Sequence, residues 1–164
     1  MTTTTVVVRR LAAEEWTGYR EVRLAALADA PEAFGSTLAR EQAFTEDVWR
    51  GRLLARNTLV AERDGESLGL VGIVPAGPGQ AELVSMWVHP AARGLGVGDL
   101  LVRAAIERAG RLGLPEVLLW VAEANAPAER LYTRHGFGRT GEVQPVDEES
   151  DRGLEFAMLR PATG

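Results

Sequence analysis

The stretch HPAARGLGVGDLLVRAA, residues 89–105, decides how the rest of the sequence is interpreted. It places Gly94, Gly96 and Gly98 at alternate positions, between a strand that a proline closes and a run of helical periodicity. The N-terminus of a helix carries unpaired N–H groups and a partial positive charge, which together bind anions such as phosphate. Glycine keeps side chains away from those groups and supplies a positive φ where the loop needs one. The stretch therefore predicts a phosphate-binding loop.

Two common phosphate loops are excluded at defined positions. A P-loop requires a lysine, and all 18 basic residues of this chain are arginine. A dinucleotide-binding loop requires Gly-x-Gly-x-x-Gly, but its third glycine falls on Asp99 or on Leu101, depending on which glycine pair begins the count. What remains is Arg93 followed by glycine three and five residues later.

Hydrophobic periodicity predicts the elements around this loop. Strands are expected at 3–11, 57–63, 66–74, 81–90, 117–122, 137–143 and 153–159, helices at 12–30, 45–55, 97–112 and 126–136, and a loop at 31–37. Asp64-Gly65 predicts an antiparallel hairpin, and the strand–helix–strand unit across the glycines predicts a right-handed parallel crossover. The sequence thus predicts an α/β (α+β) fold with a mixed sheet, as a single domain over 1–164.

Composition narrows the class of protein. The net charge of −5 does not favour nucleic acid as a partner. The absence of cysteine excludes disulfides and a thiolate nucleophile. No apolar run of 18 residues and no leader pattern occur, so we expect a cytoplasmic protein without membrane association. His89 and His135 are too few for a metal site, so both are predicted to be structural or surface residues and no metal is expected.

Two motifs resemble the GNAT superfamily of acyl-CoA-dependent N-acyltransferases. The first is Val88-His89-Pro90 with Arg93 to Gly98, and the second runs from Asn125 to Tyr132 and is followed by Gly136-Phe137. The order of elements fits this family over nearly the whole chain. The resemblance implies a sheet of six to seven strands, about four flanking helices and two central parallel strands that splay apart.

The resemblance also implies the binding residues for acetyl-CoA as co-substrate. The residues that would hold the CoA pyrophosphate, mainly through main-chain N–H groups, are Arg93, Gly94, Leu95, Gly96, Val97, Gly98 and Asp99. The backbone of Met86, Trp87 and Val88 would pair with the pantetheine arm, and the amide of Asn125 would contact the same arm. A homodimer is a further expectation from the family.

Amide formation from a thioester needs a base and an acid, because an alkyl amine with a pKa of about 10.4 is protonated at pH 7. The resemblance places Tyr132 as the acid that protonates the leaving thiolate. Glu82, Glu123 or a chain of water molecules is the candidate base. Strand alternation places Glu82, Val84 and Met86 on one face of the sheet. Since no strong covalent nucleophile is present, direct transfer in a ternary complex is expected.

The acceptor is less defined by the sequence. In the family that the chain resembles, residues 34–44 and 143–152 would shape the acceptor pocket. Glu41, Glu46 and the acids between 147 and 151 suggest a cationic amine. The leading hypothesis is an acetyl-CoA-dependent N-acetyltransferase that acts on a primary amine of a small molecule or peptide. The alternative is a catalytically inactive CoA-binding sensor or partner module.

Overall fold

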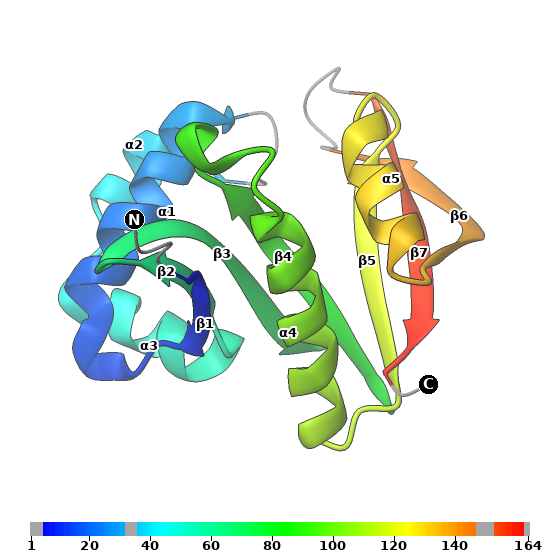
Figure 1. The fold of residues 1–164 in the computed structure, drawn as a ribbon, viewed down its shortest axis with the longest axis horizontal. Coiled ribbons are helices and arrows are strands. Elements are labelled where there is room, and N and C mark those ends of the chain that lie inside the picture. The colour runs from blue at the N-terminus through cyan, green and yellow to red at the C-terminus, as the bar shows by residue number, and fades with distance from the viewer. Residues whose placement is uncertain (1–4, 32–35, 147–152, 163–164) are drawn as a thin grey trace.

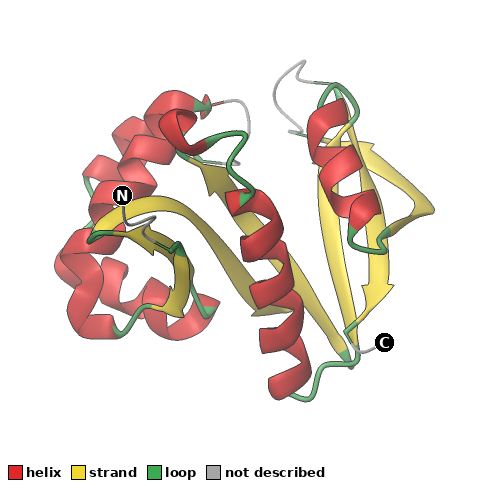
Figure 2. Ribbon diagram, in the orientation of Figure 1, coloured by secondary structure: helices red, strands yellow, loops and turns green. Residues whose placement is uncertain are grey.

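The computed structural model describes residues 5–31, 36–146 and 153–162, which form one seven-stranded mixed sheet with helices on both faces (Figures 1 and 2). The strand order is β1-β2-β3-β4-β5-β7-β6. The strands are β1 (Val7–Arg10), β2 (Leu59–Arg63), β3 (Glu66–Pro75), β4 (Gln80–Val88), β5 (Glu116–Ala122), β6 (Gly138–Pro145) and β7 (Leu154–Pro161). The helices are α1 (Trp16–Asp29), α2 (Leu38–Gln42), α3 (Glu46–Arg56), α4 (Val97–Arg111) and α5 (Ala126–Arg134). The predicted mixed α/β architecture is confirmed.

Local signals explain most helix boundaries. The Thr45 side chain accepts a hydrogen bond from the Val48 N–H at 3.4 Å and caps α3, as its sequence predicts. Gly113, at φ +74°, follows the end of α4 and is the predicted stop. The predicted helix at 12–30 was wrong at its start, because a separate 3-10 turn precedes Trp16. Helix α2 was not predicted, since five residues are too short to show a helical period.

The β2–β3 hairpin turns at Asp64 and Gly65, with φ values of +54° and +78°. Positive φ at both central residues is the geometry that matches the right-handed twist of paired strands. The run from Leu68 to Ile73 is buried along β3, so this strand is covered on both faces as predicted. The hairpin prediction from Asp64-Gly65 is confirmed.

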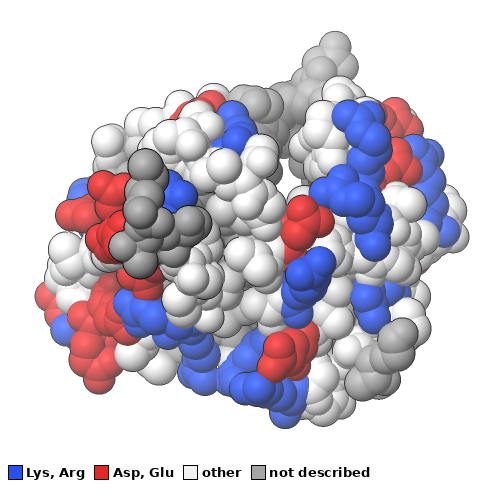
Figure 3. Space-filling view, in the orientation of Figure 1, with Lys and Arg blue, Asp and Glu red and all other residues white. Residues whose placement is uncertain are grey.

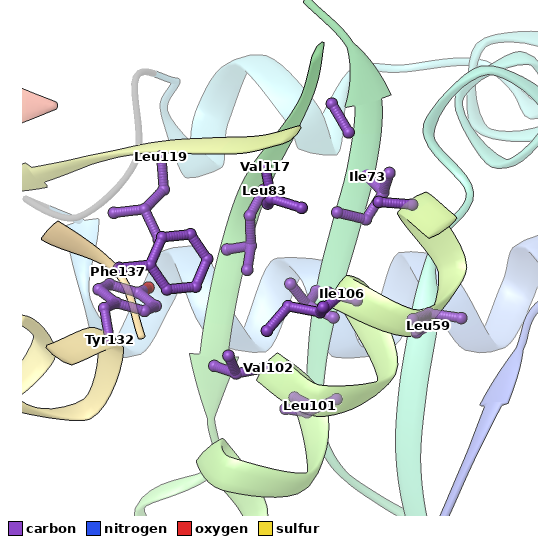
Figure 4. Close-up of a cluster of buried hydrophobic side chains, with 14 of the residues drawn as sticks. Leu59, Ile73, Leu83, Leu101, Val102, Ile106, Val117, Leu119, Tyr132 and Phe137 are labelled. Atoms are coloured by element: carbon purple, nitrogen blue, oxygen red, sulfur yellow. The ribbon is translucent and has the colours of Figure 1, made fainter. Parts of the chain in front are cut away.

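The sheet separates two hydrophobic cores. The first core lies between the sheet and helices α4 and α5 and includes Ile73, Leu101, Ile106 and Phe137 (Figure 4). The second core lies against α1 and α3 and is built around residues such as Trp49. Burying these faces supplies the main stabilisation of the domain, at about 25 cal/mol for each Å² of apolar surface removed from water.

The two central parallel strands, β4 and β5, separate after a short paired segment. Their register has three partners: Gln80 with Glu116, Ala81 with Val117, and Glu82 with Leu118. Beyond these positions β4 and β5 continue without pairing to each other, and Figure 1 shows the opening between them. The predicted splay of the central strands is therefore confirmed.

A β-bulge at Ser85 changes which face of the sheet β4 presents. Ser85 has φ +58°, and the register with β3 shifts, so that Trp87 lies opposite Leu70 while Val84 lies opposite Gly72. Leu83 belongs to the first core, whereas Trp87 belongs to the second.

The bulge corrects the prediction that Glu82, Val84 and Met86 share one face. Glu82 and Val84 alternate with Ala81 and Leu83, which belong to the first core, so they face the side of α1 and α3. Met86 packs against the first core instead. Strict alternation failed because a non-glycine residue adopts the left-handed conformation at the bulge, which no pattern in the sequence predicts.

Replacing Gly69 in β3 with alanine is expected to destabilise the protein by about 1–3 kcal/mol through overpacking. An added Cβ would lie 2.6 Å from the Trp87 carbonyl oxygen and 3.0 Å from Leu101 Cδ1, and the backbone oxygen cannot move without disturbing β4. Gly51→Ala is the matched control, because Gly51 is exposed in α3 and a Cβ added there would have no atom within 4 Å. Urea denaturation should show lower stability for G69A and equal or higher stability for G51A. Equal stabilities for the two variants would contradict the close approach of β3 and β4.

Candidate functional site

A cavity of about 600 Å³ lies where β4 and β5 diverge, and Figure 3 shows the surface hollowed between the start of α4 and α5. The cavity receives residues from both sides of the sheet. Its lining residues are Arg23, Ser36, Arg40, Arg52, Arg56, Glu82, Leu83, Val84, Ser85, Met86, Trp120, Val121, Ala122, Asn125, Ala128, Tyr132, Gln144, Val146 and Glu155. The sequence-predicted Glu82, Met86, Asn125 and Tyr132 thus meet at one place.

The glycine loop presents bare backbone at the start of α4. Gly94 and Gly96 have φ values of +86° and +79°, and both would place a Cβ in open space. Gly96 is the N-cap of α4 and offers no side-chain cap. The N–H groups of residues 97–99 have no backbone partner in the described part of the chain, while the Leu100 N–H reaches the Gly96 oxygen at 3.2 Å. This arrangement is suited to binding an anion.

Gly98 has a different role from the one that the loop pattern predicts. Its φ is not positive, and an added Cβ would lie 3.3 Å from Leu131 Cδ2 on α5. Gly98 therefore permits α4 and α5 to pack closely beside the cavity. It does not contribute the left-handed conformation that Gly94 and Gly96 supply.

The charged side chains of the loop are engaged by neighbouring elements. Arg93 pairs with Asp29 at 2.5 Å and donates through Nε to the Val88 carbonyl at 3.1 Å. Asp99 lies 2.7 Å from His135 Nε2 and 3.1 Å from an Arg134 nitrogen. The hydrogen bond with His135 and the charge of Arg134 lower the pKa of Asp99. Anion binding here therefore falls to the main chain.

Both histidines are structural, as predicted. His135 bridges α5 to Asp99 in the first turn of α4. The His89 Nδ1 accepts a hydrogen bond from the Ala91 N–H at 3.0 Å and caps the short turn before the glycine loop. Within the ranges 5–31, 36–146 and 153–162, no group of three His, Asp or Glu side chains is arranged to hold a metal ion.

Of the residues predicted to contact a pantetheine arm, Met86 and Asn125 line the opening, whereas Trp87 and Val88 do not. Met86 lines the cavity, while Trp87 lies opposite Leu70 in the β3 register and donates its indole N–H to Asp29 at 3.0 Å. Asn125 caps α5 through its Oδ1, which accepts from the Ala128 N–H at 3.2 Å. Asn125 also lines the cavity, and its amide nitrogen takes no part in this cap.

Tyr132 lies on α5 with its ring packed edge-on against Phe137, at 5.8 Å between ring centroids (Figure 4). Only 6% of the residue is exposed, yet it lines the cavity. Burial raises the pKa of the Tyr132 hydroxyl. A neutral hydroxyl at the cavity wall is therefore maintained over the whole physiological pH range.

Glu82 reaches the same cavity from the opposite face of the sheet. Burial and the charge of Glu155 on β7 raise the pKa of Glu82. Glu123, the competing carboxylate in the sequence, is exposed and does not line the cavity. The gap between β4 and β5 thus lets a tyrosine from one face and a carboxylate from the other line the same cavity.

An arginine–glutamate network closes the cavity on the side of α1, α2 and α3. Glu41 is fully buried and accepts two hydrogen bonds from Arg23, at 2.9 and 3.0 Å, and one from Arg52 at 3.0 Å. Burial alone would raise the pKa of Glu41, but the hydrogen bonds of Arg23 and the charges of both arginines outweigh it and lower the pKa. Arg23 also donates to the Ser85 hydroxyl at 3.0 Å, which ties the network to the bulge.

The network corrects the expectation that Glu41 and Glu46 would attract a cationic acceptor. Glu41 is neutralised by two guanidinium groups, and Glu46 pairs with Arg50 at 2.7 Å outside the cavity. The acids at 147–151, which entered the same expectation, lie outside the described residues, as does Phe34 of the predicted acceptor pocket.

Four charged residues of the cavity were not anticipated from the sequence: Arg23, Arg52, Arg56 and Glu155. Arg52 and Arg56 are four residues apart in a helix, a spacing that could have placed them on one face. Arg23 and Glu155 reach the cavity through the packing of distant segments, which leaves no comparable pattern in the sequence.

A second, larger groove of about 840 Å³ lies between α1 and the β2–β3 hairpin. It contains none of the predicted catalytic residues, and its charged lining includes Arg9, which is ion-paired with Glu15 and Glu62. The opening between β4 and β5 is therefore the better candidate site. No described helix combines the length and apolar character needed to cross a membrane.

The opened pair of parallel strands, the uncapped start of α4 and the buried Tyr132 agree with the class of acyl-CoA-dependent N-acyltransferases that the two sequence motifs resemble. The family model described as Acetyltransferase (GNAT) family matches residues 13–137. The chain belongs to this family, and the resemblance in the two sequence motifs is confirmed.

Individual relatives agree with this membership. A mycothiol acetyltransferase from Thermomonospora curvata is 35% identical over 125 residues, which are 75% of this chain and 40% of that protein. The chain thus spans about two fifths of the length of this curated relative. The GNAT-family acetyltransferase structure from Streptococcus pneumoniae superposes with a TM-score of 0.77 at 22% identity, covering 96% of this chain and 99% of that one. YncA from Salmonella typhimurium, solved with acetyl-CoA, gives 0.74 at 23% identity, with 99% and 96% coverage.

Replacing Glu41 with glutamine is expected to cost about 3–5 kcal/mol of stability at neutral pH, because it leaves buried arginine charge uncompensated. The pKa of Glu41 is lowered in the folded state, so its contribution is present above the ordinary value of 4.5 and is lost as the pH falls through the folded-state pKa. Urea denaturation at several pH values should therefore show the two proteins converging in acid. Glu46→Gln, on an exposed pair, should have little effect. A constant difference down to low pH would contradict the ion pair.

Proposed function

We propose that this protein is an acetyl-CoA-dependent N-acetyltransferase that acts on a primary amine by direct transfer in a ternary complex. The observation that carries the proposal is the meeting of Tyr132 and Glu82 in one cavity, from opposite faces of the sheet, through the gap between β4 and β5. A cytoplasmic location and a homodimer stay predictions from the sequence.

The donor would enter along the side of α4 and α5. Its pyrophosphate would lie at the loop from Arg93 to Asp99 and accept hydrogen bonds mainly from the main-chain N–H groups of residues 97–99, where the N-terminus of α4 favours negative charge. Basic side chains gather over α4 and α5 in Figure 3, although the whole chain has a net charge of −5. The pantetheine arm would lie between the Met86–Val88 segment and Asn125.

Two structures of similar fold support this choice of donor. YncA from Salmonella typhimurium was solved with acetyl-CoA, and the PaiA acetyltransferase from Thermoplasma acidophilum was solved in complex with coenzyme A. The PaiA structure covers 96% of this chain and superposes with a TM-score of 0.69 at 17% identity.

The acid and base roles follow from the protonation states that the site favours. Glu82, held in a partly buried place beside Glu155, would take a proton from the acceptor ammonium and free the nitrogen lone pair. The nitrogen then bonds to the acetyl carbon, the carbon–sulfur bond breaks, and the nitrogen releases its second proton to solvent to leave the neutral amide. Tyr132 would donate its proton to the leaving sulfur and recover it from solvent. The raised pKa of Glu82 suits a base, because the proton affinity of an ordinary carboxylate is far below that of an amine.

Tyr132→Phe is expected to lower kcat by about 100-fold or more, the usual contribution of a positioned acid. The ring packing against Phe137 would survive, so coenzyme A binding by calorimetry should be unchanged. Tyr19→Phe is the matched control, because Tyr19 is the other tyrosine of the chain and is buried against Trp49 away from the cavity. Thiol release from acetyl-CoA measures the rate. Full turnover by Y132F would remove the proposed acid, and coenzyme A binding without any thiol release by the wild type would favour the inactive binding module.

The pH profile of kcat/KM should contain an acid limb above 4.5, the ordinary pKa of glutamate, because the proton must leave Glu82 before it can act as a base. Glu155→Gln removes a neighbouring negative charge and should shift this limb to lower pH. Glu82→Gln should abolish the limb and lower kcat/KM. If the limb persists in E82Q and disappears in Glu123→Gln, the base is Glu123; a limb unaffected by either variant indicates a water chain.

A further inference from the structure

Among the residues that the structure describes, the cavity wall formed by α1, α2 and α3 carries more positive than negative charge. Arg23, Arg40, Arg52 and Arg56 all line the cavity on this side. Glu41 pairs with both Arg23 and Arg52. The Arg52 group is fixed in place, 4.7 Å above the Phe44 ring.

Arg40 and Arg56 add two further charges. Neither forms an ion pair with a residue in the described ranges. Burial and the neighbouring charge of Arg52 lower the pKa of half-buried Arg56, and the nearby charge of Glu41 offsets this only in part. Arg40 is exposed on the short α2, 5.9 Å from the Phe44 ring. A buried or half-buried charge without a partner is costly, so an anion on this wall would be stabilising.

The opposite wall of the same cavity is acidic. Glu82 on β4 and Glu155 on β7 both line it, and Gln144 donates to Glu155 at 2.6 Å. Opposite walls of the cavity therefore carry opposite charge, with arginines on the helices and carboxylates on the strands. A ligand that complements both walls has an amine at one end and an anionic group at the other.

Resting on the N-acetyltransferase activity proposed above, we infer that the acceptor is a small primary amine that also carries an oxyanion, with a carboxylate as the simplest case. The oxyanion would bind Arg40, Arg52 and Arg56, and the amine would lie at Glu82. Guanidinium groups suit this role because their planar fork of N–H donors matches a carboxylate in two places. This inference replaces the cationic acceptor suggested by the acidic residues of the sequence.

The cationic wall is separate from the place where the donor phosphates would bind. Helix α3 packs on the second core, on the opposite face of the sheet from α4, whose residues belong to the first core. The glycine loop and the cationic wall thus approach the gap from different faces. An acceptor entering from the side of α1 and α3 would meet the donor at the gap between β4 and β5.

The test offers acetyl-CoA and the proteinogenic α-amino acids, each beside its own α-carboxamide, and measures thiol release. The carboxamide has the same side chain, and its amine is less basic than that of the amino acid. A larger fraction of that amine is unprotonated at neutral pH, so a site that does not recognise the carboxylate should prefer the carboxamide as acceptor. We expect at least one amino acid to have a KM about 10-fold or more below that of its carboxamide, as loss of a charged hydrogen bond would give. Arg56→Gln and Arg40→Gln should each raise the KM of the amino acid while leaving that of the carboxamide within about 2-fold.

Three controls keep the outcomes distinct. Arg50→Gln changes an arginine on the same helix that pairs with Glu46 outside the cavity, and should leave both KM values unchanged. Arg56→Lys keeps the charge and should retain part of the preference. Arg40→Gln covers the case in which Arg56→Gln fails to fold, because Arg40 is exposed.

The results separate this inference from the proposed function. If no amine of any kind releases thiol, the N-acetyltransferase proposal fails. If neutral amines are acetylated as well as amino acids and the arginine variants change neither KM, only the inference about the acceptor is overturned. If the variants weaken coenzyme A binding in calorimetry and leave acceptor KM unchanged, the arginines serve the donor phosphates and the inference is wrong.

Discussion

The bulge at Ser85 is the constraint on which the rest of the site depends. A parallel pair of strands normally gains a hydrogen bond at each successive position, yet β4 and β5 stop pairing after Glu82. Three residues later Ser85 takes a left-handed conformation that costs a non-glycine residue about 1 kcal/mol or more. The cost is offset by the contacts around it, including the hydrogen bond that Ser85 accepts from Arg23. The opened strands are therefore held by side chains from α1 as well as by the sheet.

The same network connects the bulge to the second core. Arg23 binds Ser85 and Glu41 at once, and Glu41 binds Arg52, whose guanidinium stacks on Phe44. A buried ion pair of this kind adds little net stability over apolar packing, but the loss of one partner is costly. The network also has a geometric effect. It fixes α1, α2 and α3 relative to β4, and so sets the width of the cavity. The structure of the helical layer and the geometry of the site are thus controlled by the same side chains.

Much of the architecture could be predicted because it depends on local signals. The Asp64-Gly65 hairpin, the Thr45 cap and the end of α4 at Gly113 each arise from residues adjacent in sequence. Gly94 and Gly96 were also assigned correctly to positions that need positive φ. Gly98 was grouped with them by spacing, although its role is close packing against Leu131 on another helix. Contacts between distant segments, such as that of Glu41 with Arg23, leave no periodic pattern, so the sequence does not distinguish an acid that is paired with buried arginines from one that attracts a cation.

The net charge of the whole chain is a weak guide to the charge at a particular site. The chain carries 23 acidic and 18 basic residues, yet one wall of the cavity has four arginines around a single described carboxylate. Fields at a site are set by charges within about 10 Å, since salt screens those farther away. Helix α3 begins with Glu46 and Asp47 and ends with Arg56, an order that favours the helix dipole at both ends. Because the C-terminal end of α3 lies against β3 beside the opened strands, the arrangement that stabilises the helix also places the Arg56 guanidinium at the cavity.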